Sequence, residues 1–163
     1  MLGKTGIVIM NNITIVPMAA EHISAIAQIE KACFSTPWSE KALREELDVP
    51  AAHFVTALVD GTIAGYMGMQ LAGDVGYVCN VAVSPDFRRC GVASALVAAQ
   101  MAYAKAAGLS EISLEVRSSN TAARGLYEKL GFVWLGTRPR FYREPEENAE
   151  IYSLYLDSPE LLP

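Results

Sequence analysis

The sequence predicts an α+β domain, built on a mixed and mostly antiparallel sheet of six to seven strands that about four helices flank. Three observations support this prediction. Strand-like and helix-like runs follow one another in mixed order along the 163 residues. Two turn signals, Asp60-Gly61 and Gly73-Asp74, divide residues 53–83 into the three strands of an antiparallel meander. One strand–helix–strand crossover, between residues 75 and 117, would add a parallel pair.

The first part of the chain is predicted to form one strand and two helices before this meander. Residues 13–18 (ITIVPM) have the apolar character of a strand, and apolar side chains follow at helical spacing from Ile23 to Ile29. Ser39 is a favourable N-cap for a short second helix, which Pro50 ends.

The second part is predicted to form two helices and three strands. Apolar residues recur on one helical face from Val92 to Ala106, and Gly108 suits the left-handed position that follows. Residues 111–117 (EISLEVR) alternate apolar and polar side chains, which is typical of a strand with one buried face. The other expected elements are a helix within 118–131, strands at 132–137 and 150–156, and a polar, acidic connection at 143–150.

Composition limits the possible functions. The length and the apolar content of 52% fit one domain over residues 1–163, with residues 1–12 as a flexible extension. A net charge of −5 argues against nucleic-acid binding, which requires a basic surface, and favours a cationic partner. The chain lacks a signal-peptide core and an apolar run of the ~20 residues that a membrane span requires. We therefore expect a cytoplasmic protein that binds no membrane, and we favour a monomer.

The cysteines indicate a reduced compartment. Cys33, Cys79 and Cys90 are odd in number, widely spaced and without a CxxC pair. This pattern predicts neither a disulfide framework nor a zinc site, and we expect no metal.

A basic, glycine-containing turn at residues 88–91 precedes the helix expected from Val92. The first N–H groups of a helix lack partners and carry partial positive charge, so this turn is a candidate anion site. Gly91 allows a phosphate to approach the backbone, and Ala93 and Ser94 are small. The chain lacks both GxxxxGK[ST] and GxGxxG, which excludes the common nucleotide motifs. A plain loop-to-helix junction with solvated arginines is the alternative.

Four segments resemble the GNAT superfamily of N-acetyltransferases, and within it the ribosomal-protein-alanine N-acetyltransferases. They are FSTPWSEKAL (34–43), NVAVSPDFRRCGVASALV (80–97), LEVRSSNTAARGLYEKLGF (114–132) and the pair Phe141-Tyr142. RRCGVA (88–93) corresponds to the superfamily motif [RQ]xxGx[GA]. Cys90 and Ala93 replace commoner residues, and RPRFY (138–142) departs from the usual pattern near the acceptor.

The resemblance implies acetyl-CoA as cofactor, in a GNAT fold whose sheet splays between the strands at 75–83 and 111–117. The amides of the pantetheine arm would pair with the strand near Val81 and Val83, and the pyrophosphate would meet the turn backbone. Asn120 would contact the cofactor, or alternatively cap its helix. The implied cofactor-binding residues are Val81, Ala82, Val83, Arg88, Arg89, Cys90, Gly91, Val92, Ala93, Ser94, Asn120 and Tyr127.

The resemblance also implies two catalytic residues. Glu115 would accept the proton of the attacking amine, directly or through water. An ordinary glutamate pKa of ~4.3 makes a weak base, so we expect burial to raise the pKa of Glu115. Tyr127 would donate a hydrogen bond to the departing thiolate, and the Val81 N–H would stabilise the oxyanion. The alternatives are a surface Glu115 paired with Arg117 and a Tyr127 that only fills the core.

Acceptor chemistry favours an α-amine. Presenting the neutral amine at pH 7 costs ~1.4 kcal/mol for an α-amine and ~4.6 kcal/mol for lysine, from pKa values of ~8 and ~10.4. The resemblance implies the N-terminal alanine of a small-subunit ribosomal protein as acceptor, held by Trp38, Phe141 and Tyr142; ordinary packing is the alternative for these aromatics. Two other functions remain open: acetylation of a small-molecule amine or of protein lysine, and a non-catalytic acyl-CoA sensor.

Overall fold

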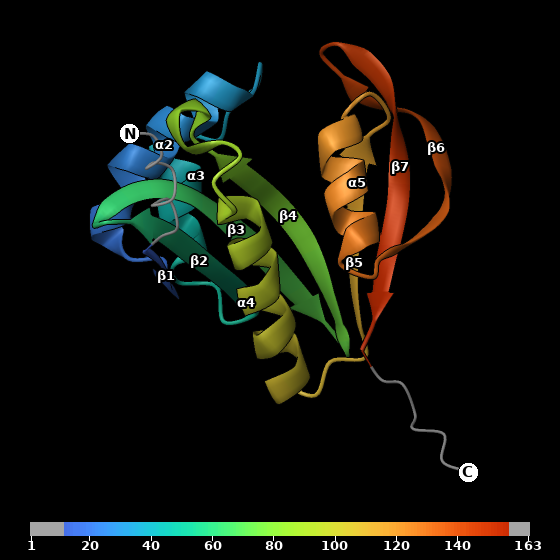
Figure 1. The fold of residues 1–163 in the computed structure, drawn as a ribbon, viewed down its shortest axis with the longest axis horizontal. Helices are drawn as coiled ribbons and strands as arrows, with labels where there is room; N and C mark the ends of the chain where they lie inside the picture. The colour runs from blue at the N-terminus through green and yellow to red at the C-terminus, as the bar shows by residue number, and fades with distance from the viewer. Residues whose placement is uncertain (1–11, 157–163) are drawn as a thin grey trace, which may run out of the picture. The chain divides into compact units, whose positions relative to one another are not determined.

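The computed structural model describes residues 12–156 and confirms the α+β fold. Within that range the strands are β1 (Ile13–Pro17), β2 (Ala52–Val59), β3 (Thr62–Ala72), β4 (Val75–Val83), β5 (Glu111–Arg117), β6 (Val133–Arg143) and β7 (Glu146–Tyr155). The α-helices are α2 (Ile23–Cys33), α3 (Glu40–Glu46), α4 (Val92–Ala106) and α5 (Thr121–Lys129). Short 3-10 helices, η1 (Ala20–His22) and η2 (Pro85–Phe87), lie before α2 and α4. The seven strands follow the order β1-β2-β3-β4-β5-β7-β6 (Figure 1).

The described chain divides into two compact units, which we describe separately. The amino-terminal unit contains the residues up to Met69 together with Asn80–Gln100, and the carboxy-terminal unit contains Gln70–Cys79 together with the residues from Met101 onward. The single domain expected from the length stays a prediction. Of the expected N-terminal extension, residues 1–11 lie outside the described residues.

The amino-terminal unit packs helices on both faces of its strands. In Figure 1, α2 and α3 lie on one face of β1–β3, and their core includes Ile26, Leu43 and Phe54. His53 is bonded to Gln100 of α4 at 2.7 Å. Because neighbouring residues of a strand point to opposite faces, α4 lies on the other side of β2 from α2 and α3.

An aromatic row crosses this core. The ring of Phe54 lies between Trp38 and Tyr66, with centroid distances of 6.4 Å and 6.3 Å. Phe54 fits because residue 68 is glycine: a Cβ there would lie 2.3 Å from atoms of the Phe54 ring. The row therefore depends on a missing side chain in β3.

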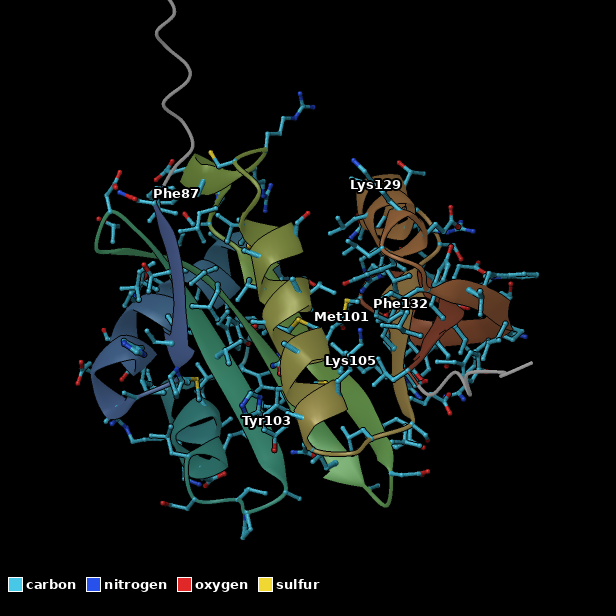
Figure 2. All side chains as sticks on the ribbon, turned by 60° about the horizontal axis from the view of Figure 1, so that its bottom comes forward. Phe87, Met101, Tyr103, Lys105, Lys129 and Phe132 are labelled. Carbon is cyan, nitrogen blue, oxygen red and sulfur yellow. The ribbon has the colours of Figure 1, made fainter. Side chains whose placement is uncertain are left out.

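The carboxy-terminal unit is built around β7. This strand pairs antiparallel with the whole of β5 on one side and with β6 on the other, and α5 runs along β5 and β7 (Figure 1). Lys129 extends from the end of α5 away from the strands, whereas Phe132 turns toward them and is buried (Figure 2). As expected, β5 buries its apolar side chains and leaves Glu111, Ser113, Glu115 and Arg117 half-buried.

The expected connection at residues 143–150 is wrong. β6 continues to Arg143 and β7 begins at Glu146, so that Glu144-Pro145 alone links the two strands. Phe141 and Tyr142 consequently lie on β6 and not in a loop. Most side chains of this hairpin are exposed, so backbone pairing rather than an apolar pattern defines it.

The parallel pair predicted by the crossover is present. It joins Val75 to Glu111, Gly76 to Ile112 and Tyr77 to Ser113. In the described chain this register covers only the first three residues of β4 and β5. The expected divergence of these strands stays a prediction.

Candidate active site

The turn before α4 has the backbone geometry of an anion site. Arg89 and Gly91 are both left-handed, with φ values of 63° and 86°. The helical ladder begins with the bond from Ala95 N–H to the Gly91 carbonyl at 3.1 Å, so the N–H groups of residues 92–94 precede it. Left-handed residues in a turn direct successive N–H groups toward a common point, which suits a phosphate. We call residues 88–94 the cofactor turn, and their predicted contact with the diphosphate of acetyl-CoA stays a prediction.

The two arginines of the turn differ. Arg88 Nη2 donates to the sulfur of Cys33 at 3.4 Å, and that thiol donates to the Val83 carbonyl at 3.4 Å. Arg89 and Cys90 are exposed. Arg88 therefore joins the turn to the end of α2, a contact that the sequence did not predict.

Side chains at the end of β4 alternate between the core and the opposite face of the strand. Ala82 is 4% exposed and belongs to the core beneath α2, so only its backbone is available to a ligand. Val81 and Val83 are half-buried, and as neighbours of Ala82 they point to the opposite face. Of the three residues of β4 predicted to bind the cofactor, Val81 and Val83 therefore present side chains away from the α2 core.

Glu115 is less buried than we expected. Its side chain is 32% exposed, and Oε2 pairs with Arg138 of β6 at 3.6 Å. The alternative pairing with Arg117 is wrong: Arg117 contacts Glu147 at 3.1 Å and lies over the Tyr142 ring at 4.3 Å.

Tyr127 is buried in the carboxy-terminal unit, 6% exposed, between the rings of Phe132 and Tyr152 at 5.4 Å and 6.4 Å. No hydrogen bond to its hydroxyl is found among residues 12–156. Burial, and secondarily the nearby Tyr142, raises the pKa of Tyr127 to about 12. The phenol is therefore protonated throughout the neutral range, and its hydrogen is available to an acceptor.

Tyr142 connects the two candidate catalytic residues. Burial, and secondarily the negative charge of Glu115, raises the pKa of Tyr142 to about 12. The negative charge of an ionised Tyr142 in turn contributes to the raised pKa of Tyr127. Glu115, Tyr127 and Tyr142 therefore share one region of the carboxy-terminal unit. Tyr142 also lines an open cavity of about 250 Å³ with Arg140, Arg143 and Glu146.

The other predicted site residues have clear structural contacts. Asn120 caps α5, because its Oδ1 accepts the Ala123 N–H at 3.1 Å; its contact with a cofactor stays a prediction. Trp38 is half-buried against Phe54 in the segment before α3. Phe141 is 39% exposed and meets the edge of Tyr142 at a centroid distance of 5.0 Å.

Sequence reasoning missed several neighbours of these residues. Arg138 and Arg117 come close to Glu115 and Tyr142 through the register of β5, β7 and β6, which no local pattern signals. The Tyr152 hydroxyl accepts from Arg124 at 3.1 Å and donates to Glu128 at 2.6 Å, which fixes α5 on both sides of Tyr127.

Three further observations concern membrane-spanning helices, metal-binding clusters and cysteines. No helix within residues 12–156 is long and apolar enough to cross a membrane. In the same residues, no three His, Cys, Asp or Glu side chains gather in a way that could hold a metal ion. Cys33 is half-buried, Cys79 and Cys90 are exposed, and all three are free thiols.

Comparison with known proteins gives a consistent result. The family model described as "Acetyltransferase (GNAT) family" matches residues 23–132. The chain is 33% identical to the ribosomal protein bS18-alanine N-acetyltransferase of Haemophilus ducreyi, over 83% of this chain and 95% of that protein. It is 30% identical to the N-alpha-acetyltransferase RimI of Mycobacterium tuberculosis, over 90% and 93%. The crystal structure of the ribosomal-protein-S18-alanine N-acetyltransferase from Escherichia coli matches with a TM-score of 0.82 and 30% identity, over 93% and 99%.

Proposed function

Because the chain belongs to the acetyltransferase (GNAT) family, we propose that it transfers the acetyl group of acetyl-CoA to the α-amine of a protein N-terminus. The acceptor we propose is the N-terminal alanine of a small-subunit ribosomal protein. Two of its relatives support this choice, because their names describe N-acetyltransferases of the alanine of ribosomal protein bS18 or S18.

The cofactor turn and the end of β4 supply the binding groups in this proposal. The left-handed residues Arg89 and Gly91 support diphosphate binding, because backbone N–H groups at a helix start attract anions without a bulky side chain in the way. The backbone near Val81 and Val83 would hold the pantetheine amides, and the Val81 N–H would stabilise the oxyanion. Acetyl-CoA supplies an activated acyl group as its thioester.

Glu115 and Tyr127 have different roles in the proposed reaction: Glu115 accepts a proton, and Tyr127 donates a hydrogen bond. Glu115 accepts the proton that the α-amine loses, directly or through water, once the amine replaces Arg138 as its partner. Tyr127 donates its hydrogen bond to the sulfur as the carbon–sulfur bond breaks. Full proton transfer from a phenol of pKa about 12 to a thiolate of ordinary pKa ~8.5 would cost about 5 kcal/mol, so Tyr127 stabilises the thiolate without giving up its proton.

One observation carries the proposal: the side chain of Tyr127 is buried, its phenol is protonated, and no side chain or backbone group among residues 12–156 hydrogen-bonds its hydroxyl. The buried polar side-chain atoms that lack a partner in the described chain are Thr56 Oγ1 and Asn80 Oδ1, so the Tyr127 hydroxyl itself remains accessible. A buried ring with an accessible, protonated hydroxyl is suited to donate a hydrogen bond to a group that arrives with the cofactor.

The test uses purified protein, acetyl-CoA and extracted small-subunit ribosomal proteins, with mass spectrometry to locate the added acetyl group. We expect it on an N-terminal alanine. A matched peptide with a blocked N-terminus and an internal lysine, together with a polyamine, serves as control. Faster acetylation of either control would overturn the proposal. The double variant Glu115→Gln/Tyr127→Phe should keep acetyl-CoA binding and lose turnover, whereas a sensor would show no turnover to lose.

A further inference from the structure

Glu30 is a buried carboxylate that the proposed chemistry does not use. It lies on α2 and is 1% exposed. No cationic side chain pairs with it among residues 12–156. A buried charge is costly unless hydrogen bonds compensate it, so the groups that surround Glu30 explain why it is retained.

Three donors from three different parts of the chain converge on this carboxylate. The backbone N–H of Trp38 donates to Oε1 at 2.9 Å, and the Tyr66 hydroxyl donates to Oε2 at 2.5 Å. The side-chain amide of Asn80 donates to Oε2 at 3.3 Å. Glu30 thereby joins α2, the segment before α3, β3 and β4. We call Glu30, Trp38, Tyr66 and Asn80 the Glu30 cluster.

One end of the cluster fixes the segment that carries Trp38. The carboxylate holds its backbone, and the aromatic row from Trp38 through Phe54 to Tyr66 holds its indole. Ser39, the next residue, caps α3 by accepting from Ala42 N–H at 3.1 Å. Glu30 therefore sets the backbone of Trp38 directly and its side chain indirectly, through Tyr66 and then Phe54.

The other end of the cluster fixes β4 at the residue before Val81. The Oδ1 of Asn80 is buried without a hydrogen-bond partner, whereas its Nδ2 donates to Glu30. A buried acceptor without a donor costs free energy, so the bond to Glu30 determines the orientation of this amide. One helical turn beyond Glu30, Cys33 donates to the Val83 carbonyl, which fixes the same strand again.

We propose that Glu30 is a positioning residue, whose carboxylate couples the acceptor segment at Trp38 to the acetyl-binding strand at Asn80 and Val81. This inference rests on the proposed function, which assigns Trp38 to the acceptor and Val81 to the acetyl group. Neither assignment requires Trp38 and Val81 to be coupled. The Glu30 cluster supplies that coupling.

The principal test compares Glu30→Gln with the wild type in steady-state kinetics. Glutamine keeps the shape, but it has one acceptor oxygen for three donors and turns an NH₂ group toward one of them. We expect the acceptor KM to rise about tenfold, the size expected for losing one hydrogen bond to a charged group, with the acetyl-CoA Kd nearly unchanged. A fall in kcat alone, with both constants unchanged, would overturn the inference.

Gln100→Leu is the control for general destabilisation. Gln100 is fully buried in the same unit and donates to the carbonyls of His53 and Met67, both at 3.1 Å. It contacts no member of the Glu30 cluster through these bonds. We expect this variant to lose thermal stability with an unchanged acceptor KM. An equal rise in acceptor KM in both variants would assign the effect to stability and overturn the inference.

Trp38 fluorescence separates this inference from the proposed function. The chain has two tryptophans, so Trp38 alone reports in a Trp134→Phe background. We expect acetyl-CoA to change Trp38 emission in that protein, and Glu30→Gln or Asn80→Leu to abolish the change. Leucine at position 80 keeps the volume and removes the unpaired oxygen, so this variant should fold even if Glu30→Gln does not. An emission change that persists in the folded Asn80→Leu protein would overturn the inference, whether or not any acceptor is acetylated.

Discussion

The two units form their candidate binding groups by different means. In the amino-terminal unit the cofactor turn is made of backbone, with Arg89 and Gly91 left-handed before α4. In the carboxy-terminal unit the candidate groups are side chains: the catalytic candidates Glu115 and Tyr127 and the acceptor-binding candidate Tyr142, which strand pairing and burial bring to one region. A backbone site tolerates side-chain changes and is sensitive to conformation, whereas a side-chain site is sensitive to single atoms.

The largest effect should come from a single oxygen atom. In Tyr127→Phe the departing thiolate loses its donor, and we expect kcat to fall about 10²-fold while the Kd for acetyl-CoA changes less than about threefold. Because the pKa of Tyr127 is raised to about 12, the phenol keeps its proton as the pH rises. The kcat ratio of wild type to variant should therefore stay constant between about pH 6 and pH 10.

Tyr155→Phe is the matched control for this variant, because Tyr155 lies on β7 of the same unit and is 56% exposed. It should leave kcat unchanged. A kcat ratio that declines well below pH 10 would show that the phenol ionises there, against the burial of Tyr127.

The backbone site should respond to conformation. Gly91→Ala places a Cβ in a left-handed conformation at a cost of about 1–2 kcal/mol, and relief of this strain would reorient the N–H groups of the turn. We expect the Kd for acetyl-CoA, measured by calorimetry, to rise about tenfold if one such contact is lost. The kcat at saturating acetyl-CoA should change little.

Gly61→Ala is the control, since Gly61 has the same φ of 86° in the hairpin between β2 and β3. It should lower the free energy of unfolding by a similar amount without weakening acetyl-CoA binding. Equal losses of affinity in the two variants would mean that strain, and not the turn, accounts for the effect.

The smallest effect concerns stability alone. Glu150 is 6% exposed and accepts hydrogen bonds from Ser118 at 2.5 Å and from Trp134 and Thr137, both at 2.7 Å. These bonds lower its pKa to about 2 from the ordinary 4.5. A depressed carboxyl pKa stabilises the fold above pH 4.5, and this contribution is lost as the pH falls toward 2. The urea midpoint of Glu150→Gln should therefore lie below that of the wild type at pH 7 and approach it near pH 2.

Glu45→Gln provides the comparison, because Glu45 is exposed and pairs with Lys41, which lies one turn away on the same helix. Its urea midpoint should follow the wild type at both pH values. A Glu150→Gln curve parallel to the wild type across the range would contradict the assigned pKa.

The same contrast explains what could be predicted from the sequence. The cofactor turn was predictable because glycine and small residues before a helix specify backbone conformation locally, and Ser39 and Asn120 cap their helices for the same reason. Glu115 was placed correctly on the polar face of β5. Its partner Arg138 was not predictable, since that contact depends on how β6 and β7 pair.

One wrong prediction and one missed residue have physical causes. Residues 143–150 contain charged side chains without apolar alternation, and only backbone pairing makes them parts of β6 and β7. The position of Glu30 in the sequence does signal its burial. It continues the apolar positions Ile23, Ile26 and Ala27 at helical spacing, and a charge on such a face must find buried partners.

The aromatic row limits how the acceptor preference of this chain could be redesigned. The ring of Phe54 occupies the volume that any side chain at position 68 would require, so a larger residue there would displace the ring on which Trp38 rests. Directed-evolution libraries should therefore leave codon 68 unchanged. Phe141 is exposed on β6, so varying the residue at that position would not disturb the core.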